Sequence, residues 1–75
     1  MRLDELEIEQ KAIIKSIDAN STLAHRLASF GIVRGEEITI KSVSLGKQTI
    51  EIEVENTLIA LRNEEAHKIE VELID

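Results

Sequence analysis

The chain contains no cysteine and no proline, and Phe30 is its only residue among phenylalanine, tyrosine and tryptophan. Without cysteine it forms neither disulfides nor the usual cysteine-based structural zinc site, and a reducing compartment suits it. A chain of 75 residues must then hold its core together by burial alone, at a size where only about 60% of the unfolded surface becomes buried. With one aromatic residue it also cannot build the aromatic-lined groove that binds proline-rich ligands.

Basic residues are in the minority, with nine lysines and arginines against fifteen aspartates and glutamates and a net charge of −6. They are scattered singly from Arg2 to Lys68, with no two adjacent. Because nucleic-acid binding depends on a basic face that neutralises phosphates, this pattern argues against a nucleic-acid partner. No apolar stretch approaches the length of about 20 residues that a membrane helix needs, and the N-terminus has no apolar signal-peptide core. We therefore expect one cytoplasmic domain over residues 1–75.

The motifs that usually carry catalysis are also missing. "GK" at residues 46–47 lacks the earlier glycine and the following serine or threonine of a phosphate loop, and no serine lies in a Gly-x-Ser-x-Gly turn. "DAN" at residues 18–20 begins like a calcium loop, but Leu23 stands where that loop needs glycine. Both segments are interpreted as turns, the second leading into a helix. We expect no catalytic residue and no enzyme.

His25 and His67 are the only histidines. A catalytic metal usually takes three protein ligands, which here would require Glu64 or Glu65 as well. Isolated histidines at exposed positions are far more often solvated surface residues. We therefore expect no metal site and no cofactor.

Two stretches of alternating hydrophobicity, residues 10–17 and 36–43, predict bent β-strands. In each, the apolar residues keep one face at first and then slip by one position. Their apolar positions are Ala12, Ile14 and Ile17 in the first stretch, and Ile38, Ile40 and Val43 in the second. One extra residue re-aims the face of a strand, so each slip predicts a bulge or a sharp bend. Two bent strands in so short a chain predict a small, strongly curled sheet that closes toward a barrel.

Residues 49–55 and 57–62 predict a hairpin whose turn is Glu55-Asn56. Paired positions then add up to 111, which sets apolar residues opposite one another on one face of the hairpin. The pairs are Ile50 with Leu61 and Ile52 with Ile59. Asn56 tolerates the left-handed conformation that such turns need, whereas Glu55 is a poor choice for it.

Residues 20–31 predict the one true helix. Asn20 or Ser21 is a suitable N-cap, and Gly31 is a suitable left-handed residue after the last turn. Apolar residues recur at i, i+4 and i+7, and we expect this stripe to face the core. The stripe comprises Leu23, Leu27 and Phe30.

"NEEAH" at residues 63–67 predicts a single helical turn before the last strand. Asn63 is expected to cap the turn and Ala66 to pack inward. Ile69, Val71 and Leu73 are then expected to complete the sheet. The residues predicted to be buried are Leu27, Ile38, Ile40, Ile52, Ile59, Leu61, Ile69 and Val71.

Three segments carry a resemblance to a known family. They are "RLASFGIVRGEEI" from Arg26, "SLGKQTIEIEV" from Ser44 and "IALRNEEAHKIEVE" from Ile59. Each motif alone is weak, but three in order at the right spacing are specific. Together with a leading "LDEL" at residues 3–6, they resemble the FeoA family, ferrous iron transport protein A, over almost the full length. The chain departs from the family at turns that often hold proline or glycine, namely Ile8-Glu9, Gln48-Thr49 and Glu55-Asn56.

The resemblance implies a mainly β fold: a small SH3-like β-barrel of about five strands, with one short α-helix and a helical turn before the last strand. It also implies a cytoplasmic accessory protein of ferrous iron uptake, which binds and modulates the cytosolic GTPase part of the FeoB membrane transporter. Contact with the membrane would then occur only through that partner. Two alternatives stay open, an SH3-like domain of the iron-dependent repressor type and a metal-sensing or iron-carrier protein. A homo-oligomer stays open as well.

Four residues are expected outside the core although a lone monomer has no evident need of them there. They are Arg26, Val33, Leu45 and Leu58. Scattered exposed aliphatic residues are normal and need no role. If these four cluster, they would form a small apolar patch with a cationic anchor, a composition favoured at interface centres. We therefore treat them as the hypothetical partner-binding residues.

Overall fold

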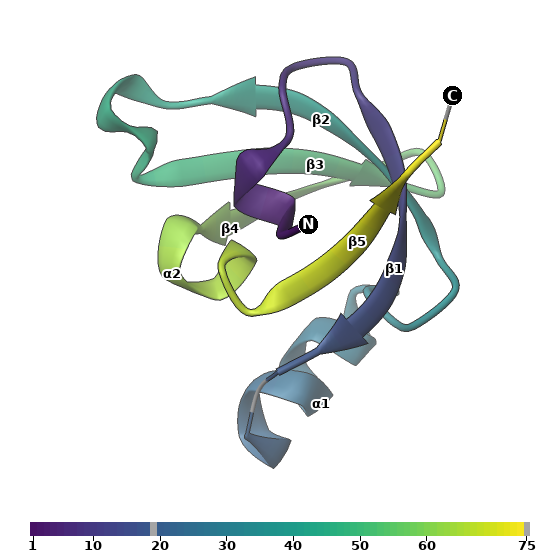
Figure 1. The fold of residues 1–75 in the computed structure, drawn as a ribbon. Helices are drawn as coiled ribbons and strands as arrows, with labels where there is room; N and C mark the ends of the chain where they lie inside the picture. The colour runs from purple at the N-terminus through teal and green to yellow at the C-terminus, as the bar shows by residue number, and fades with distance from the viewer. Residues whose placement is uncertain (19, 75) are drawn as a thin grey trace.

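The computed structural model describes residues 1–18 and 20–74. Five strands form one antiparallel sheet in the order β4-β3-β2-β1-β5, which curls around the core (Figure 1). The strands are β1 (Lys11–Ile17), β2 (Glu37–Val43), β3 (Thr49–Val54), β4 (Thr57–Arg62) and β5 (Ile69–Leu73). The helical segments are η1 (Leu3–Glu5), α1 (Ser21–Ser29), η2 (Leu45–Lys47) and α2 (Asn63–Ala66). The mainly β architecture, with one short helix and a helical turn before the last strand, is confirmed.

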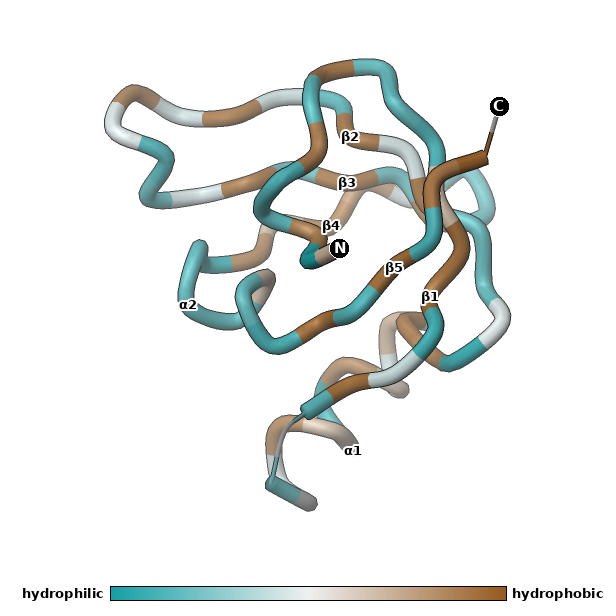
Figure 2. Tube along the Cα trace, viewed as in Figure 1, coloured by the Kyte–Doolittle hydropathy of each residue, from teal (hydrophilic) through white to brown (hydrophobic). Residues whose placement is uncertain are grey.

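Both predicted bends are present as register shifts. The pairing of β1 with β5 shifts between Ile14 and Ser16, and the pairing of β2 with β3 shifts between Ile40 and Ser42. Because β1 and β2 are neighbours within the sheet, the two bends act on its middle and turn it into a curl. Figure 2 shows hydrophobic and hydrophilic residues alternating along β5, as expected for a strand with one buried face.

The β3–β4 hairpin has the predicted register, with Ile50 opposite Leu61 and Ile52 opposite Ile59. Its turn residues Glu55 and Asn56 have φ of 49° and 67°. Both are left-handed, which is the combination that a two-residue hairpin turn with the correct twist requires. Glu55 therefore adopts a conformation that glutamate disfavours.

Helix α1 begins and ends as predicted. The side chain of Asn20 accepts a hydrogen bond of 2.8 Å from the Leu23 amide. At the other end Gly31 has φ of +86°, and the Ile32 amide donates to the Leu27 carbonyl at 3.0 Å. This 6→1 bond, together with burial of Leu27 and Ile32, is the Schellman arrangement that reverses the chain.

The predicted apolar stripe of α1 is only partly correct. Leu27 is fully buried and Leu23 packs partly buried against the core, but Phe30 is 48% exposed. Phe30 is the C-cap residue, and its backbone is no longer helical, with φ of −97° and ψ of 3°. The helical periodicity therefore does not reach it, and Ile32 fills the core position after the reversal.

The cap of α2 differs from the prediction. Arg62, the last residue of β4, is the N-cap, and its amide donates to the Glu65 carboxylate at 2.9 Å. Asn63 is already the first helical residue, and its amide donates to the Gln48 carbonyl at 3.0 Å. The expectation that Asn63 caps the turn was wrong because β4 runs directly into the helix. Ala66 is fully buried, as predicted.

The N-terminal segment is a core element that sequence reasoning missed. Leu3 is fully buried and Leu6 is 6% exposed. The Val71 amide donates to the Met1 carbonyl at 2.7 Å, so the first residues lie along the outer edge of β5. Leu73, expected to complete the sheet with Ile69 and Val71, lies at the end of β5 and is 38% exposed.

All eight residues predicted to be buried are buried, the most exposed being Ile59 at 6%. Among the described residues, no helix is long and apolar enough to cross a membrane.

Leu27→Ala is expected to lower the free energy of unfolding by about 2–5 kcal/mol, because it leaves a cavity at a fully buried site. This loss is a large part of the total free energy of unfolding of a domain of this size, which is about 4–11 kcal/mol. Urea unfolding measures the loss. Phe30→Ala is the matched control on the same helix and should change stability little. Equal midpoints for Leu27→Ala and the parent would contradict the packing described for α1.

Gly31→Val is expected to destabilise by more than the roughly 1 kcal/mol of an ordinary glycine substitution. A Cβ at this position would meet Val54 at an ordinary 3.6 Å, so the loss comes from the positive φ and not from a clash. Gly31→Asn is the control, since asparagine tolerates the left-handed region. Thermal unfolding should rank the parent first, then Gly31→Asn, then Gly31→Val, and equal stability of the two variants would refute the backbone argument.

Candidate functional site

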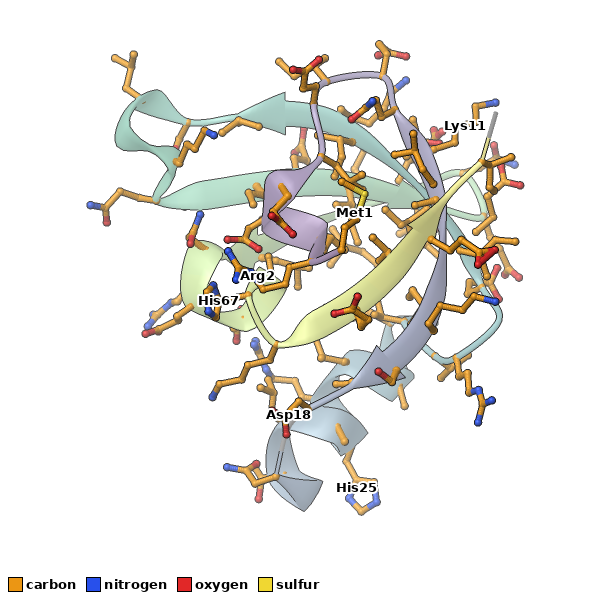
Figure 3. All side chains as sticks on the ribbon, viewed as in Figure 1. Met1, Arg2, Lys11, Asp18, His25 and His67 are labelled. Atoms are coloured by element: carbon orange, nitrogen blue, oxygen red, sulfur yellow. The ribbon has the colours of Figure 1, made fainter. Side chains whose placement is uncertain are left out.

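The two histidines lie in separate places and share no site. His25 is exposed on α1, whereas His67 follows α2 and lies near Arg2 (Figure 3). Within residues 1–18 and 20–74, no group of three or more His, Cys, Asp or Glu side chains could hold a metal ion. The nearest carboxylate partner of His67 is Asp4, at 3.3 Å from its Nδ1.

Asp4 links the N-terminal segment to α2. Its side chain is 12% exposed, and it accepts a hydrogen bond of 3.1 Å from Arg2 Nε in addition to the contact with His67. Burial acts to raise the pKa of the Asp4 carboxyl, but the hydrogen bonds and charges of Arg2 and His67 together lower the pKa below its ordinary value. The ionised Asp4 therefore acts as a structural clamp between η1 and the end of α2.

An acidic hollow of about 420 Å³ lies at the turn end of the β3–β4 hairpin. It is lined by Glu9, Lys11, Glu36, Glu37, Thr39, Lys41, Glu53, Glu55 and Asn56. Desolvation raises the pKa of Glu36, and the neighbouring carboxylates of Glu55 and Glu37 raise the pKa further. Lys41 offsets part of this repulsion by pairing with Glu9 at 3.3 Å. The hollow is a place where like charges are crowded together.

A larger hollow of about 800 Å³ lies between η2 and α2, at the opposite end of β3. It is lined by Gly46, Lys47, Gln48, Thr49, Arg62, Asn63, Glu64, His67 and Lys68. We call it the cationic hollow, because three basic residues and a histidine line it against a single glutamate. The bond from the Asn63 amide to the Gln48 carbonyl joins its two walls.

Sequence reasoning missed the cationic hollow, because its basic residues are far apart along the chain. A signal was nevertheless present. The hairpin rule that paired positions add up to 111 extends past the strands and places Gln48 opposite Asn63, as the hydrogen bond between them shows. Lys47 then lies near Arg62 and the turn that follows it.

All four hypothetical partner-binding residues have exposed side chains. Leu45 is 98% exposed, Leu58 55% and Val33 40%. Arg26 is half exposed and forms an ion pair with Glu65 of α2. Arg26 thus also has a structural role, in joining α1 to α2.

The structure does not gather these four residues into one patch. Leu58 lies opposite Glu53 near the turn of the hairpin, whereas Leu45 lies in the loop before Thr49. Since a strand rises about 3.3 Å per residue, the four residues from Thr49 to Glu53 alone separate them by about 13 Å. A single small partner segment would not cover both ends.

The family model and the curated relatives that match this chain agree on one family. A family model described as FeoA domain matches residues 1–73. The chain is 40% identical over 74 residues to a Campylobacter jejuni protein named as an Fe(2+) transport protein A, and covers all of it. It is 32% identical over 74 residues to the "Fe(2+) transport protein A/Fe(2+) transporter FeoB fusion protein" of Porphyromonas gingivalis, of which it covers 9%.

Solved structures share the fold. The crystal structure of Stenotrophomonas maltophilia FeoA complexed with zinc, described as a procaryotic SH3 domain protein, is 33% identical with a TM-score of 0.83. The alignment covers 96% of this chain and 89% of that one. The crystal structure of T. acidophilum IdeR is 28% identical with a TM-score of 0.88, and the alignment covers 99% of this chain and 34% of that one. The SH3-like fold is confirmed.

Asp4→Asn is expected to destabilise the protein at neutral pH and to do so less as the pH falls. A carboxyl whose pKa is lowered on folding stabilises the folded state at any pH above its ordinary pKa of 3.8. This stabilisation is lost as the pH falls through the lower pKa that the carboxyl has in the folded state. Urea unfolding of parent and variant, from neutral pH to well below 3.8, measures the difference. Glu72→Gln, at an exposed carboxylate, is the control. A difference for Asp4→Asn that stays constant over this range would contradict the clamp.

Proposed function

Because the chain belongs to the FeoA family of ferrous iron transport accessory proteins, we propose that it binds the cytosolic GTPase part of a FeoB-like transporter and modulates it. The protein is then cytoplasmic, reaches the membrane only through this partner, and acts by binding and not by catalysis.

The observation that carries this proposal is the Porphyromonas gingivalis fusion. In that protein an Fe(2+) transport protein A and a transporter FeoB are one chain. A covalent link keeps two modules at a high effective concentration, which favours even a weak contact between them. A separate chain of the same family needs a binding surface to reach the same arrangement.

The surface of the protein is compatible with such a role. Leu45, Val33 and Leu58 expose apolar side chains, and two charged hollows of opposite sign lie at the two ends of β3. Apolar anchors surrounded by charged residues are typical of interfaces between proteins that also exist apart. The family's iron substrate would remain with the transporter.

A metal-carrier function is the second candidate, favoured by the zinc complex of the Stenotrophomonas maltophilia protein. It predicts that His25 or His67 contributes to binding of ferrous iron. Titration of ferrous iron against the parent and against His25→Ala and His67→Ala separates this candidate from the proposed one. Stoichiometric iron binding that either substitution abolishes would support a carrier, whereas an accessory protein needs no iron of its own.

The proposed function predicts that the parent binds the purified cytosolic part of the transporter in a calorimetric titration. Arg26→Glu, Leu45→Glu and Leu58→Glu test the hypothetical partner residues, and at least one should weaken binding by about fivefold or more, as expected for an interface residue worth more than about 1 kcal/mol. Ile8→Glu is the matched control at another exposed aliphatic residue. Circular dichroism confirms that each variant is folded. Undiminished binding by all three variants would place the contact elsewhere, and no binding by the parent would refute the function.

A further inference from the structure

We propose that the cationic hollow between η2 and α2 binds an acidic segment of a protein partner. The inference names the surface and the chemistry of the interaction, and it rests on the proposed function only for the identity of that partner. Its basis is the charge, the backbone conformation and the surroundings of Lys47, Arg62 and Lys68.

The cationic hollow is lined mainly by positive side chains, although the protein as a whole has a net negative charge. The chain carries −6 overall, yet three of its nine basic residues line this one hollow, against Glu64 as the single acid. Lys47 and Lys68 form no ion pair with any described residue. The Arg62 guanidinium is 3.9 Å from a Glu64 carboxylate oxygen, and the two side chains are 78% and 75% exposed. Exposed pairs at such a distance contribute little. The cations of the hollow are therefore available to an external anion.

The backbone holds Lys47 in an unfavourable conformation. Lys47 has φ of 56° and directly follows Gly46, whose φ is 76°. Glycine adopts this region freely and asparagine tolerates it, whereas a lysine there is strained by about 1 kcal/mol or more. Folding alone would favour glycine at position 47, so the local backbone does not explain why a lysine stands there.

The surroundings of the hollow favour a polypeptide over other anions. Leu45 lies beside Gly46 at the rim and is 98% exposed, and an apolar partner side chain would cover it. The three cations come from two walls joined by the bond between Asn63 and Gln48, so they suit several carboxylates spread along a segment. A long polyanion or an anionic membrane would also be repelled by the net negative charge of the whole protein. A short segment stays within about one Debye length, roughly 8 Å, of the cations that attract it.

The test uses a short synthetic peptide of glutamate and leucine residues with blocked ends, titrated into ¹⁵N-labelled protein. We expect saturable shifts of the backbone amides at positions 46–49 and 62–68. A peptide with glutamine in place of glutamate should give none. The double variant Lys47→Gly with Lys68→Glu should weaken binding by about fivefold or more, since each exposed ion pair contributes up to about 1 kcal/mol. Lys15→Glu, which reverses an exposed charge on β1, should bind within about twofold of the parent.

Lys47→Gly alone separates binding from folding. It relieves the positive φ, so its melting temperature should equal or exceed that of the parent, while its affinity for the peptide falls. Shifts that avoid positions 46–49 and 62–68, or an unchanged affinity of the double variant, would overturn the proposal. So would inorganic phosphate that binds as tightly as the peptide, because the hollow would then be a site for a small anion.

The same variants distinguish this inference from the proposed function. A parent that binds the peptide but not the cytosolic part of the transporter would refute the function and leave the chemistry of the hollow standing. A transporter complex that is insensitive both to salt and to the double variant would show that the partner lies on another surface, and would refute the hollow as the contact.

Discussion

The register of the β3–β4 hairpin is the constraint on which most of the molecule depends. Pairing Ile50 with Leu61 and Ile52 with Ile59 puts the four side chains of these two pairs into the core. A slip of one residue would turn this whole set toward water. The register is set by a two-residue turn, and it is held although Glu55 must adopt a left-handed conformation there. Burial of the apolar face outweighs this local strain.

The same register positions the candidate site. Extended by one pair beyond the strands, it brings Gln48 against Asn63 and joins the β2–β3 loop to α2. Arg62 ends β4 and caps α2, so the strand, the helical turn and one wall of the cationic hollow form a continuous unit. On the other side Asp4 holds the end of α2 through His67. A helical turn of four residues is too short to be stable by itself, and these contacts from both sides keep it in place.

Alternation and turn chemistry predicted the parts of the fold in which local sequence and tertiary packing agree. The bulges after Ile14 and Ile40, the cap at Asn20 and the left-handed Gly31 all follow from local patterns. The failures have a common physical origin, since each depends on contacts between distant segments. Leu3 lies in a three-residue helical segment and Leu6 follows it. The segment is too short to show a period, and it packs against β5 and α2. Phe30 fits the helical period, but the helix ends there and Ile32 takes its place in the core. The charged hollows were invisible for the same reason, because their residues come together only when the sheet is formed.

The separation of charge along β3 has a consequence for binding. Exposed ion pairs add little to affinity, but complementary fields steer encounters and exclude partners of the wrong sign. A protein with a net charge of −6 repels most acidic surfaces, and the cationic hollow reverses that repulsion over one small area. An acidic partner is therefore attracted only in orientations that bring its carboxylates to η2 and α2. The acidic hollow at the opposite end of β3 disfavours the reversed orientation. In the proposed complex, orientation by charge would be combined with one apolar anchor, Leu45, whose side chain is 98% exposed.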